Sequence, residues 1–413
     1  MFLKRVAFVF VMISVVFSFA EPTKPACESL ASYKDVLNCA IENHPEVQHA
    51  KLLLNQNKYL IEIAEQRPNP ELSSQFLNGK SGEDTYQYNQ INLAHTFELG
   101  GKRDARIRRS QVQIDSSEIE LRSTQEEIYL RTYLALIRLR QIASEIDVYE
   151  DALSTFERVQ KQYRTRPRMT PEQQATFTIM DIAANDYRLK RMPLINEARE
   201  KEYILEEALG RKLDVRKEFY PPFRAKWPVL KAINNSISSI ALKKTIAGLE
   251  LAQSQLSEEK SLAWPNLKLG PTFEIQSQGG QRTNAFGLNL SFTIPLFHTN
   301  GGGRSYAATA VSRAEQILET TKVVENHQLE LQRKKYEEAV STLEGALSIS
   351  DLYKKHQAIE KSFATGVVPS SLVIEIHRQM ADYIKSLSEQ ENTAIEALAR
   401  IYSIEGNLIT EGL

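Results

Sequence analysis

The clearest pattern in the chain is an alternation of apolar and polar positions between residues 283 and 297. Apolar residues occupy every second position there, at Phe286, Leu288, Leu290, Phe292, Ile294 and Leu296. Small or polar residues fill most of the positions between them. A period of two predicts a β-strand with one apolar and one polar face, typical of a strand on a soluble core or of a strand in a membrane barrel.

Three other segments show the same alternation, so the sequence predicts four strands in all. They cover residues 71–77, 86–99, 266–276 and 285–297. A short polar segment separates the two strands of each pair, which predicts two antiparallel hairpins.

Long stretches of helical periodicity follow each pair of strands. Apolar residues recur at spacings of three and four over 102–163 and again over 303–363, and returning helices are predicted over 171–209 and 370–405. A helix of roughly sixty residues would be about 90 Å long, which is stable only when other helices pack along it. We therefore predict long antiparallel coiled coils.

The order of these elements occurs twice in the chain. Pro68-Asn69 matches Pro265-Asn266. The first repeat covers 21–210, a connector rich in proline and aromatic residues covers 211–228, and the second repeat covers 229–413. Each repeat consists of a helix, two strands, a long helix and a returning helix, a unit too long for an ordinary solenoid.

Four strands cannot close a membrane barrel alone, because the smallest such barrels have about eight. A sheet with two free edges would also aggregate unless copies of itself paired with those edges. Three copies would supply about twelve strands, although a tetramer satisfies the same argument. The predicted fold is therefore mainly α with a small membrane β-barrel, closed by copies of the chain, as in a trimer of twelve strands, and continued by an α-barrel of long helices.

Glycine-rich segments join each pair of strands to its long helix. They read Gly-Gly-Lys-Arg at 100–103 and Gly-Gly-Gly-Arg at 301–304. Neither has the spacing of a phosphate-binding loop. We expect Gly100, Gly101, Gly301 and Gly302 to form strand-to-helix elbows, because glycine tolerates the backbone angles that a sharp turn requires.

The first twenty residues have the three parts of a secretory signal. Lys4-Arg5 is the charged region, residues 6–19 are apolar, and Ser18-Phe19-Ala20 is a cleavage site. We therefore predict that residues 1–20 are a signal peptide and that the chain is exported.

The chain has two cysteines, Cys27 and Cys39. In an exported protein they can form a disulfide. Lipidation of Cys27 is the alternative, which is weakened because Glu21, Lys24 and Pro25 separate it from the apolar run.

Composition and charge exclude other classes of function. The formal net charge is −1, which gives no basic excess for binding nucleic acid. No nucleophile and base, and no pair of carboxylates, have a spacing that catalysis requires, so we do not predict an enzyme. No metal site is predicted either, since the histidines are scattered without paired spacing. They are His44, His49, His95, His298, His327, His356 and His377.

Together these features resemble the TolC family of outer-membrane efflux proteins. The resemblance rests on the signal peptide, the duplicated halves, the glycine-rich strand ends and the F-x-x-G-x-x-x-x-x-L turn at 363–372. The segment FELGGKR at 97–103 is most similar to the branch of CzcC-like heavy-metal efflux channels. The match covers nearly the whole chain after the signal.

The resemblance implies a homotrimeric outer-membrane channel of a Gram-negative bacterium, with a large periplasmic portion and without catalysis or a cofactor. Such a channel is the exit duct of a tripartite system, in which a periplasmic adaptor (membrane fusion protein) and an inner-membrane pump deliver the cargo. Heavy-metal cations, drugs and polypeptides all fit this kind of conduit. The alternative function is a periplasmic coiled-coil adaptor or scaffold that does not enter the membrane.

Three groups of residues follow as candidates for this function. The resemblance places Glu375, nine residues after Gly366, at a pore constriction, where a ring of carboxylates would select cations; an ordinary solvated helix residue is the alternative. Candidate adaptor contacts at the helical turns are Arg164, Arg166, Arg168, Gly366, Val367 and Val368, although the arginines also suit the carbonyl end of a helix. Candidate lipid-facing residues are Leu288, Leu290, Phe292 and Ile294.

Overall fold

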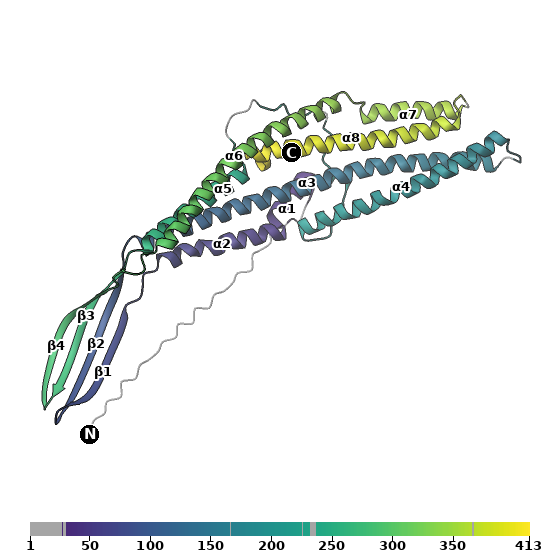
Figure 1. Cartoon of the computed structure of the whole chain (residues 1–413). Helices are drawn as coiled ribbons and strands as arrows, with labels where there is room; N and C mark the ends of the chain where they lie inside the picture. Colours follow the sequence, from purple (N-terminus) through teal and green to yellow (C-terminus); the bar gives the residue numbers. More distant parts are fainter. Residues whose placement is uncertain (1–26, 28–29, 166, 225, 232–236, 366) are drawn as a thin grey trace, which may run out of the picture.

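The computed structural model shows an elongated molecule with a β-sheet at one end and helical hairpins at the other (Figure 1). It describes residues 27, 30–165, 167–224, 226–231, 237–365 and 367–413. The predicted signal peptide lies outside these residues.

The described residues of the first half of the chain form four helices and two strands. They are α1 (Tyr33–Asn43), α2 (Pro45–Glu65), β1 (Glu71–Ser81), β2 (Asp84–Glu98), α3 (Lys102–Arg164) and α4 (Pro171–Leu209). A short 3₁₀ turn, η1 (Lys217–Phe219), lies in the connector. The second half contains α5 (Ile240–Leu262), β3 (Asn266–Gln278), β4 (Gln281–Phe292), α6 (Gly301–Glu344), α7 (Ile349–Ala364), α8 (Ser370–Glu405) and α9 (Leu408–Glu411). The chain is therefore mainly helical with a small antiparallel sheet, which confirms the predicted fold class at this level.

Local sequence explains where the long helices begin and end. The Thr170 side chain accepts a hydrogen bond from the Gln173 amide, the Gln173 side chain accepts one from the Thr170 amide, and Pro171 fits the first turn of α4. Gly210 ends α4 in the left-handed conformation, with φ of 65°. Such caps satisfy backbone groups that the helix itself leaves unpaired.

The four strands form one sheet in the order β1-β2-β3-β4, with every neighbouring pair antiparallel. The central β2–β3 ladder joins the two halves of the chain, and β1 and β4 are the edges. Gly270 in β3 permits a close approach, since a Cβ there would lie 1.7 Å from the Leu93 carbonyl oxygen. The sheet is thus a single unit shared by both repeats.

The prediction of one continuous helix over 303–363 is wrong. The helix ends at Glu344 with Gly345 as its cap, and α7 begins at Ile349. The Ser348 hydroxyl accepts a hydrogen bond from the Asp351 amide at 3.1 Å and starts the new helix. A glycine followed closely by a capping serine favours this break, which the apolar spacing on either side does not reveal.

The predicted strand over 285–297 also ends earlier than expected, at Phe292. Pro295 has no backbone N–H to give to a ladder, so the alternation of apolar residues continues past the end of the strand. The Leu296 amide instead donates to the Ile294 carbonyl at 2.9 Å, which is a local turn. Ile294 is therefore not a strand residue.

The two elbows between strands and long helices differ from each other. Gly100 and Gly101 have φ of 75° and 73°, as expected for a glycine elbow. In the second repeat Asn300 takes the left-handed conformation, with φ of 54°, while Gly301 and Gly302 already belong to α6. The expectation that Gly301 and Gly302 form the elbow is thus wrong, because asparagine also tolerates this conformation.

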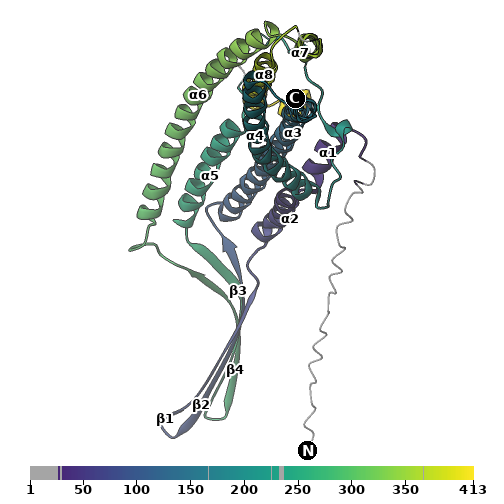
Figure 2. The same ribbon diagram turned by 90° about the vertical axis from the view of Figure 1, so that its right-hand side faces the viewer.

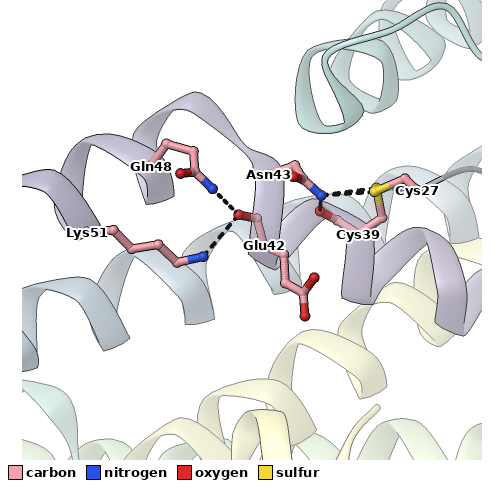
Figure 3. Close-up of a disulfide and its surroundings, with 6 residues drawn as sticks. All are labelled: Cys27, Cys39, Glu42, Asn43, Gln48 and Lys51. Carbon is pink, nitrogen blue, oxygen red and sulfur yellow. Dashed lines mark hydrogen bonds between the residues drawn. A yellow bond between two sulfur atoms is a disulfide. The ribbon is translucent and has the colours of Figure 1, made fainter. Parts of the chain in front are cut away.

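The main core lies in the middle of the helical body, where α1, α3, α4, α6 and α8 contribute buried side chains. Leu136 on α3, Leu205 on α4 and Ile401 on α8 are each fully buried there. A disulfide between Cys27 and Cys39 fastens the chain before α1 to that helix, with Cα atoms 5.9 Å apart (Figure 3). The Asn43 side chain donates to the Cys39 carbonyl oxygen at 3.1 Å beside it.

Candidate functional site

The two faces of the sheet differ in chemistry. The strand register places Leu269 opposite Leu290 and Phe273 opposite Phe286. Ile91 of β2 lies opposite Phe273, and Leu72 of β1 lies opposite Leu93. The exposed apolar side chains of this face are Leu72, Phe76, Ile91, Leu93, Phe97, Phe273, Phe286, Leu288, Leu290 and Phe292. A contiguous apolar surface of this kind marks contact with a membrane or another protein.

The opposite face of the sheet is polar and connected by hydrogen bonds. The Gln90 amide donates to Glu274 Oε1 at 2.8 Å between β2 and β3. Lys268 pairs with Glu71 at 2.8 Å across the width of β2. Figures 1 and 2 show the sheet projecting beyond the ends of the helices as a single layer. Its apolar face is therefore not packed against a helical core in the described part of the chain.

The candidate lipid-facing residues of β4 lie on the apolar face. Leu288, Leu290 and Phe292 expose 71%, 58% and 56% of their surface. Ile294 is also exposed but lies beyond the end of the strand. No helix among the described residues is both long and apolar enough to cross a membrane.

The two helical turns lie at the far end of the molecule from the sheet (Figure 1). The Arg164 guanidinium lies 5.5 Å from the centre of the Phe177 ring on the neighbouring helix, which holds it against the hairpin. Arg168 and Val367 are exposed, whereas Val368 is half-buried. The Ser370 hydroxyl donates to Thr176 Oγ1 at 3.3 Å, so the beginnings of α8 and α4 contact each other. Arg166 and Gly366 lie outside the described residues.

Glu375 near the start of α8 is paired with a cation. The Arg378 guanidinium donates to both of its carboxylate oxygens, at 2.6 and 2.9 Å, and Gln379 donates at 2.8 Å. The hydrogen bonds from Arg378 and Gln379 lower the pKa of Glu375 to about 2. Arg378 also contacts Asp382 at 3.2 Å. The carboxylate is thus charged at neutral pH, but much of its charge is offset locally.

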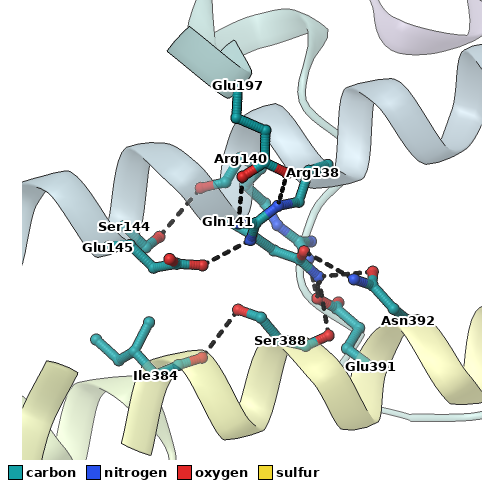
Figure 4. Close-up of polar contacts among 10 residues, drawn as sticks. All are labelled: Arg138, Arg140, Gln141, Ser144, Glu145, Glu197, Ile384, Ser388, Glu391 and Asn392. Carbon is teal, nitrogen blue, oxygen red and sulfur yellow. Dashed lines mark hydrogen bonds and ion pairs between the residues drawn. The ribbon is translucent and has the colours of Figure 1, made fainter. Parts of the chain in front are cut away.

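A network of polar side chains ties the helical body together (Figure 4). Arg138 on α3 donates two hydrogen bonds to Glu197 on α4, at 2.7 and 2.8 Å, and one to Glu145 at 2.6 Å. The bond with Glu197 is the main cause that raises the pKa of Arg138, and the same bond lowers the pKa of Glu197. This part of the network fixes α4 along α3.

The second part of the network joins α3 to α8. Glu391 is 2% exposed and accepts hydrogen bonds from Arg140 and, at 2.8 Å, from Gln141. Gln141 also exchanges hydrogen bonds with Asn392 at 3.0 and 3.2 Å. Sequence reasoning missed this contact because the two segments are about 250 residues apart and a lone glutamine carries no pattern.

A further group of side chains was missed for a similar reason. The structure brings His356 and His377 together, with their Nε2 atoms 3.0 Å apart, so the expectation of scattered histidines is wrong for this pair. Asp151 and Glu360 lie beside them. One signal was present in the sequence. His356 and Glu360 are four residues apart on one helix, so they share a face. His377 follows the turn between the two helices by about as many residues as His356 precedes it.

Comparison with known proteins finds relatives by fold rather than by sequence. No family model and no curated protein matches the sequence. The fold is similar to the outer membrane protein VceC from Vibrio cholerae, with a TM-score of 0.67 and 12% identity over 91% of this chain and 96% of that one. A membrane protein from Pseudomonas aeruginosa gives a TM-score of 0.68 and 13% identity over 94% and 96%. The CmeC outer membrane channel from Campylobacter jejuni gives 0.64 and 13% over 91% and 85%.

At this level of identity the likeness shows the fold. The chain therefore has the fold of these outer-membrane proteins and channels, in which nearly all of its length takes part. The solved structures are channels and membrane proteins rather than enzymes.

Proposed function

We propose that the chain is the outer-membrane exit duct of a tripartite efflux or secretion system in a Gram-negative bacterium. The observation that carries this proposal is the projecting sheet, whose exposed face is apolar and whose opposite face is polar. In a membrane barrel the first face would contact lipid and the second would line a water-filled lumen. The similar outer-membrane channels support the same reading.

The barrel would form from three copies of the chain. In one copy β1 and β4 are edge strands, each with a row of backbone groups that no strand pairs. Pairing β1 of each copy with β4 of the next would close about twelve strands and remove every edge. The 63-residue α3 would extend about 95 Å from this barrel, so that the helices of three copies continue the lumen into the periplasm.

The helical turns are the proposed docking end. The α3–α4 and α7–α8 turns lie at the end opposite the sheet (Figure 1), which is the end that would face a periplasmic adaptor and an inner-membrane pump. The candidate contacts of these two turns are Arg164, Arg168, Val367 and Val368. Glu375 lies in the second turn of α8, close to this end, where a carboxylate would act on cations leaving the pump. The resemblance to the CzcC-like branch makes heavy-metal cations the cargo that we propose, selected by the pump.

The location and mass of the protein test the proposal. The full chain would be expressed, the membranes fractionated, and the unheated protein measured by light scattering in detergent. A trimer in the outer-membrane fraction is expected. A monomer in the soluble periplasm would instead remove the proposed contact of the apolar face with lipid, and the adaptor or scaffold function would replace the duct.

A further inference from the structure

Four side chains with metal-binding atoms meet between three helices. Asp151 lies on α3, His356 and Glu360 on α7, and His377 on α8, and one ligand atom from each lies within 4.8 Å of all the others. His356 and His377 are 1% and 0% exposed. The side chains of Asp151 and Glu360 are 41% and 24% exposed, so the carboxylates face the side from which an ion can enter.

The distances are close to those of a tetrahedral ion site. Bonds of about 2.0–2.2 Å from a central ion to nitrogen and oxygen would place neighbouring ligand atoms roughly 3.3–3.6 Å apart. His377 Nε2 lies 3.0 Å from His356 Nε2, 3.8 Å from Asp151 Oδ2 and 3.9 Å from Glu360 Oε1. Shifts of a few tenths of an ångström would bring these distances to the values of a tetrahedral site.

When both histidines are neutral, each of the two tautomers of His356 leaves one unfavourable contact. His377 Nδ1 lies 2.7 Å from the Val373 carbonyl oxygen, which can only accept, so the proton is on Nδ1 and the Nε2 lone pair faces His356. If His356 carries its proton on Nδ1, two lone pairs face each other across 3.0 Å. If it carries the proton on Nε2, its Nδ1 lone pair faces the Asp151 carboxylate at 3.7 Å.

A cation between the two Nε2 atoms would accept both lone pairs and attract both carboxylates. That arrangement satisfies all four side chains at once.

We propose that Asp151, His356, Glu360 and His377 bind one divalent transition-metal ion of the zinc type. Two imidazoles and two carboxylates suit zinc in tetrahedral geometry, whereas calcium and magnesium prefer sites made only of oxygen. Neighbouring groups also orient two of the ligands. The Thr155 hydroxyl donates to Glu360 Oε1 at 2.7 Å, and the Val373 carbonyl oxygen lies against His377 Nδ1. The ion is a resident one, because two of its ligands are buried between packed helices.

The ion would fasten the α7–α8 hairpin of the second repeat to α3 of the first. The site lies on the part of the helical body between the main core and the turns, where a small cluster of Phe156, Tyr187 and Val373 also packs. Binding of the ion would therefore stabilise the contact between the two repeats. This inference holds whether or not the proposed duct function is correct.

Metal binding to the tag-free full chain in detergent tests the site. The protein would be stripped with a chelator and titrated with Zn²⁺ by calorimetry, and Co²⁺ would report ligand geometry through its visible absorption. One ion per chain is expected, with intense Co²⁺ bands typical of four or five ligands. The variants H356Q and E360Q should each weaken binding by at least about tenfold, since even outer-shell changes cost that much.

The matched control is H327Q, which removes an exposed histidine from α6. It should bind as the wild type does, and Zn²⁺ should raise the melting temperature of both but not of H356Q. Equal affinities of wild type and H356Q would overturn the proposal. So would a Co²⁺ spectrum of the weak, fully hydrated kind, and the cluster would then be a hydrogen-bonded histidine pair beside Asp151.

Discussion

At the scale of single residues, pairing rather than burial determines the charge of Glu375. Its pKa is lowered by the Arg378 hydrogen bonds, so the pair contributes fully to stability above the ordinary glutamate pKa of about 4.3. That contribution is lost as the pH falls toward about 2, where the carboxylate takes up a proton. Between pH 5 and 8 the charge does not change.

Replacing Glu375 with glutamine therefore tests its place in the pore. Channel currents of the wild type should not respond to pH 5–8 through this group, whereas E375Q should lower cation selectivity because it leaves Arg378 positive and unpaired by Glu375. Reversal potentials in planar bilayers measure this. The control is E319Q, which breaks a similar exposed pair with Lys322 on α6. If both variants behave alike, Glu375 is an ordinary surface residue.

Gly100 is a second residue whose identity is determined by its backbone and its neighbour. Its φ of 75° is unfavourable for residues with a side chain, and an added Cβ would lie 2.5 Å from the Trp264 ring. We expect G100A to lower the free energy of unfolding by at least about 1–2 kcal/mol. The control G302A places a methyl in open space on a helix, where it should be neutral or stabilising. Equal thermal stability of the two variants would contradict the elbow's role.

At the scale of elements, the alternation in β4 gives neighbouring positions opposite surroundings. Leu290 lies on the apolar face and Asn289, opposite Gly270, on the polar face. L290R should reduce the amount of assembled protein in the outer membrane, because arginine facing lipid costs about 2–4 kcal/mol per copy. N289R should assemble normally, since it would face the lumen. Similar assembly of the two, measured by heat-modifiable migration after urea washing, would remove the lipid-facing assignment.

The polar network between α3 and α8 is also an element-scale feature. Removing the Glu391 side chain leaves Arg140 and Gln141 without their shared acceptor, so E391A should destabilise the fold by about 3–5 kcal/mol. The exposed pair of Glu157 and Arg188 should matter far less, with E157A costing about 0–1 kcal/mol. Denaturant unfolding compares the two. A similar small loss for both would mean that water replaces the buried contact.

At the scale of the whole molecule, the two repeats form one folded unit. They share the β2–β3 ladder, the packing of α3 against α8 and a single main core. A protease site inserted at Val229, which is 93% exposed and directly follows the connector, should allow cutting without separation of the halves. Gel filtration under native conditions should give one particle of unchanged size. Release of either half would show that the repeats are independent domains.

Much of the fold could be predicted because its signals are local. Alternation over 71–77 and helical spacing over 102–163 depend only on neighbours in sequence, as do proline and glycine breaks. The misplaced boundaries at Glu344 and Phe292 arose where the apolar pattern continued past a capping or proline signal. The candidate site was harder to predict, because the charge around Glu375 depends on its hydrogen bonds with Arg378 as well as on its own position.

Local periodicity was enough to predict most of the helices, the four strands and the apolar side of each strand, because periodicity is a property of consecutive residues. The pairing of β2 with β3, the contact of Gln141 with Glu391 and the meeting of Asp151 with the two histidines appear only in the folded chain. Those contacts join residues far apart in the chain. Their formation depends on the packing of several helices at once, and no local pattern in the sequence carries that information.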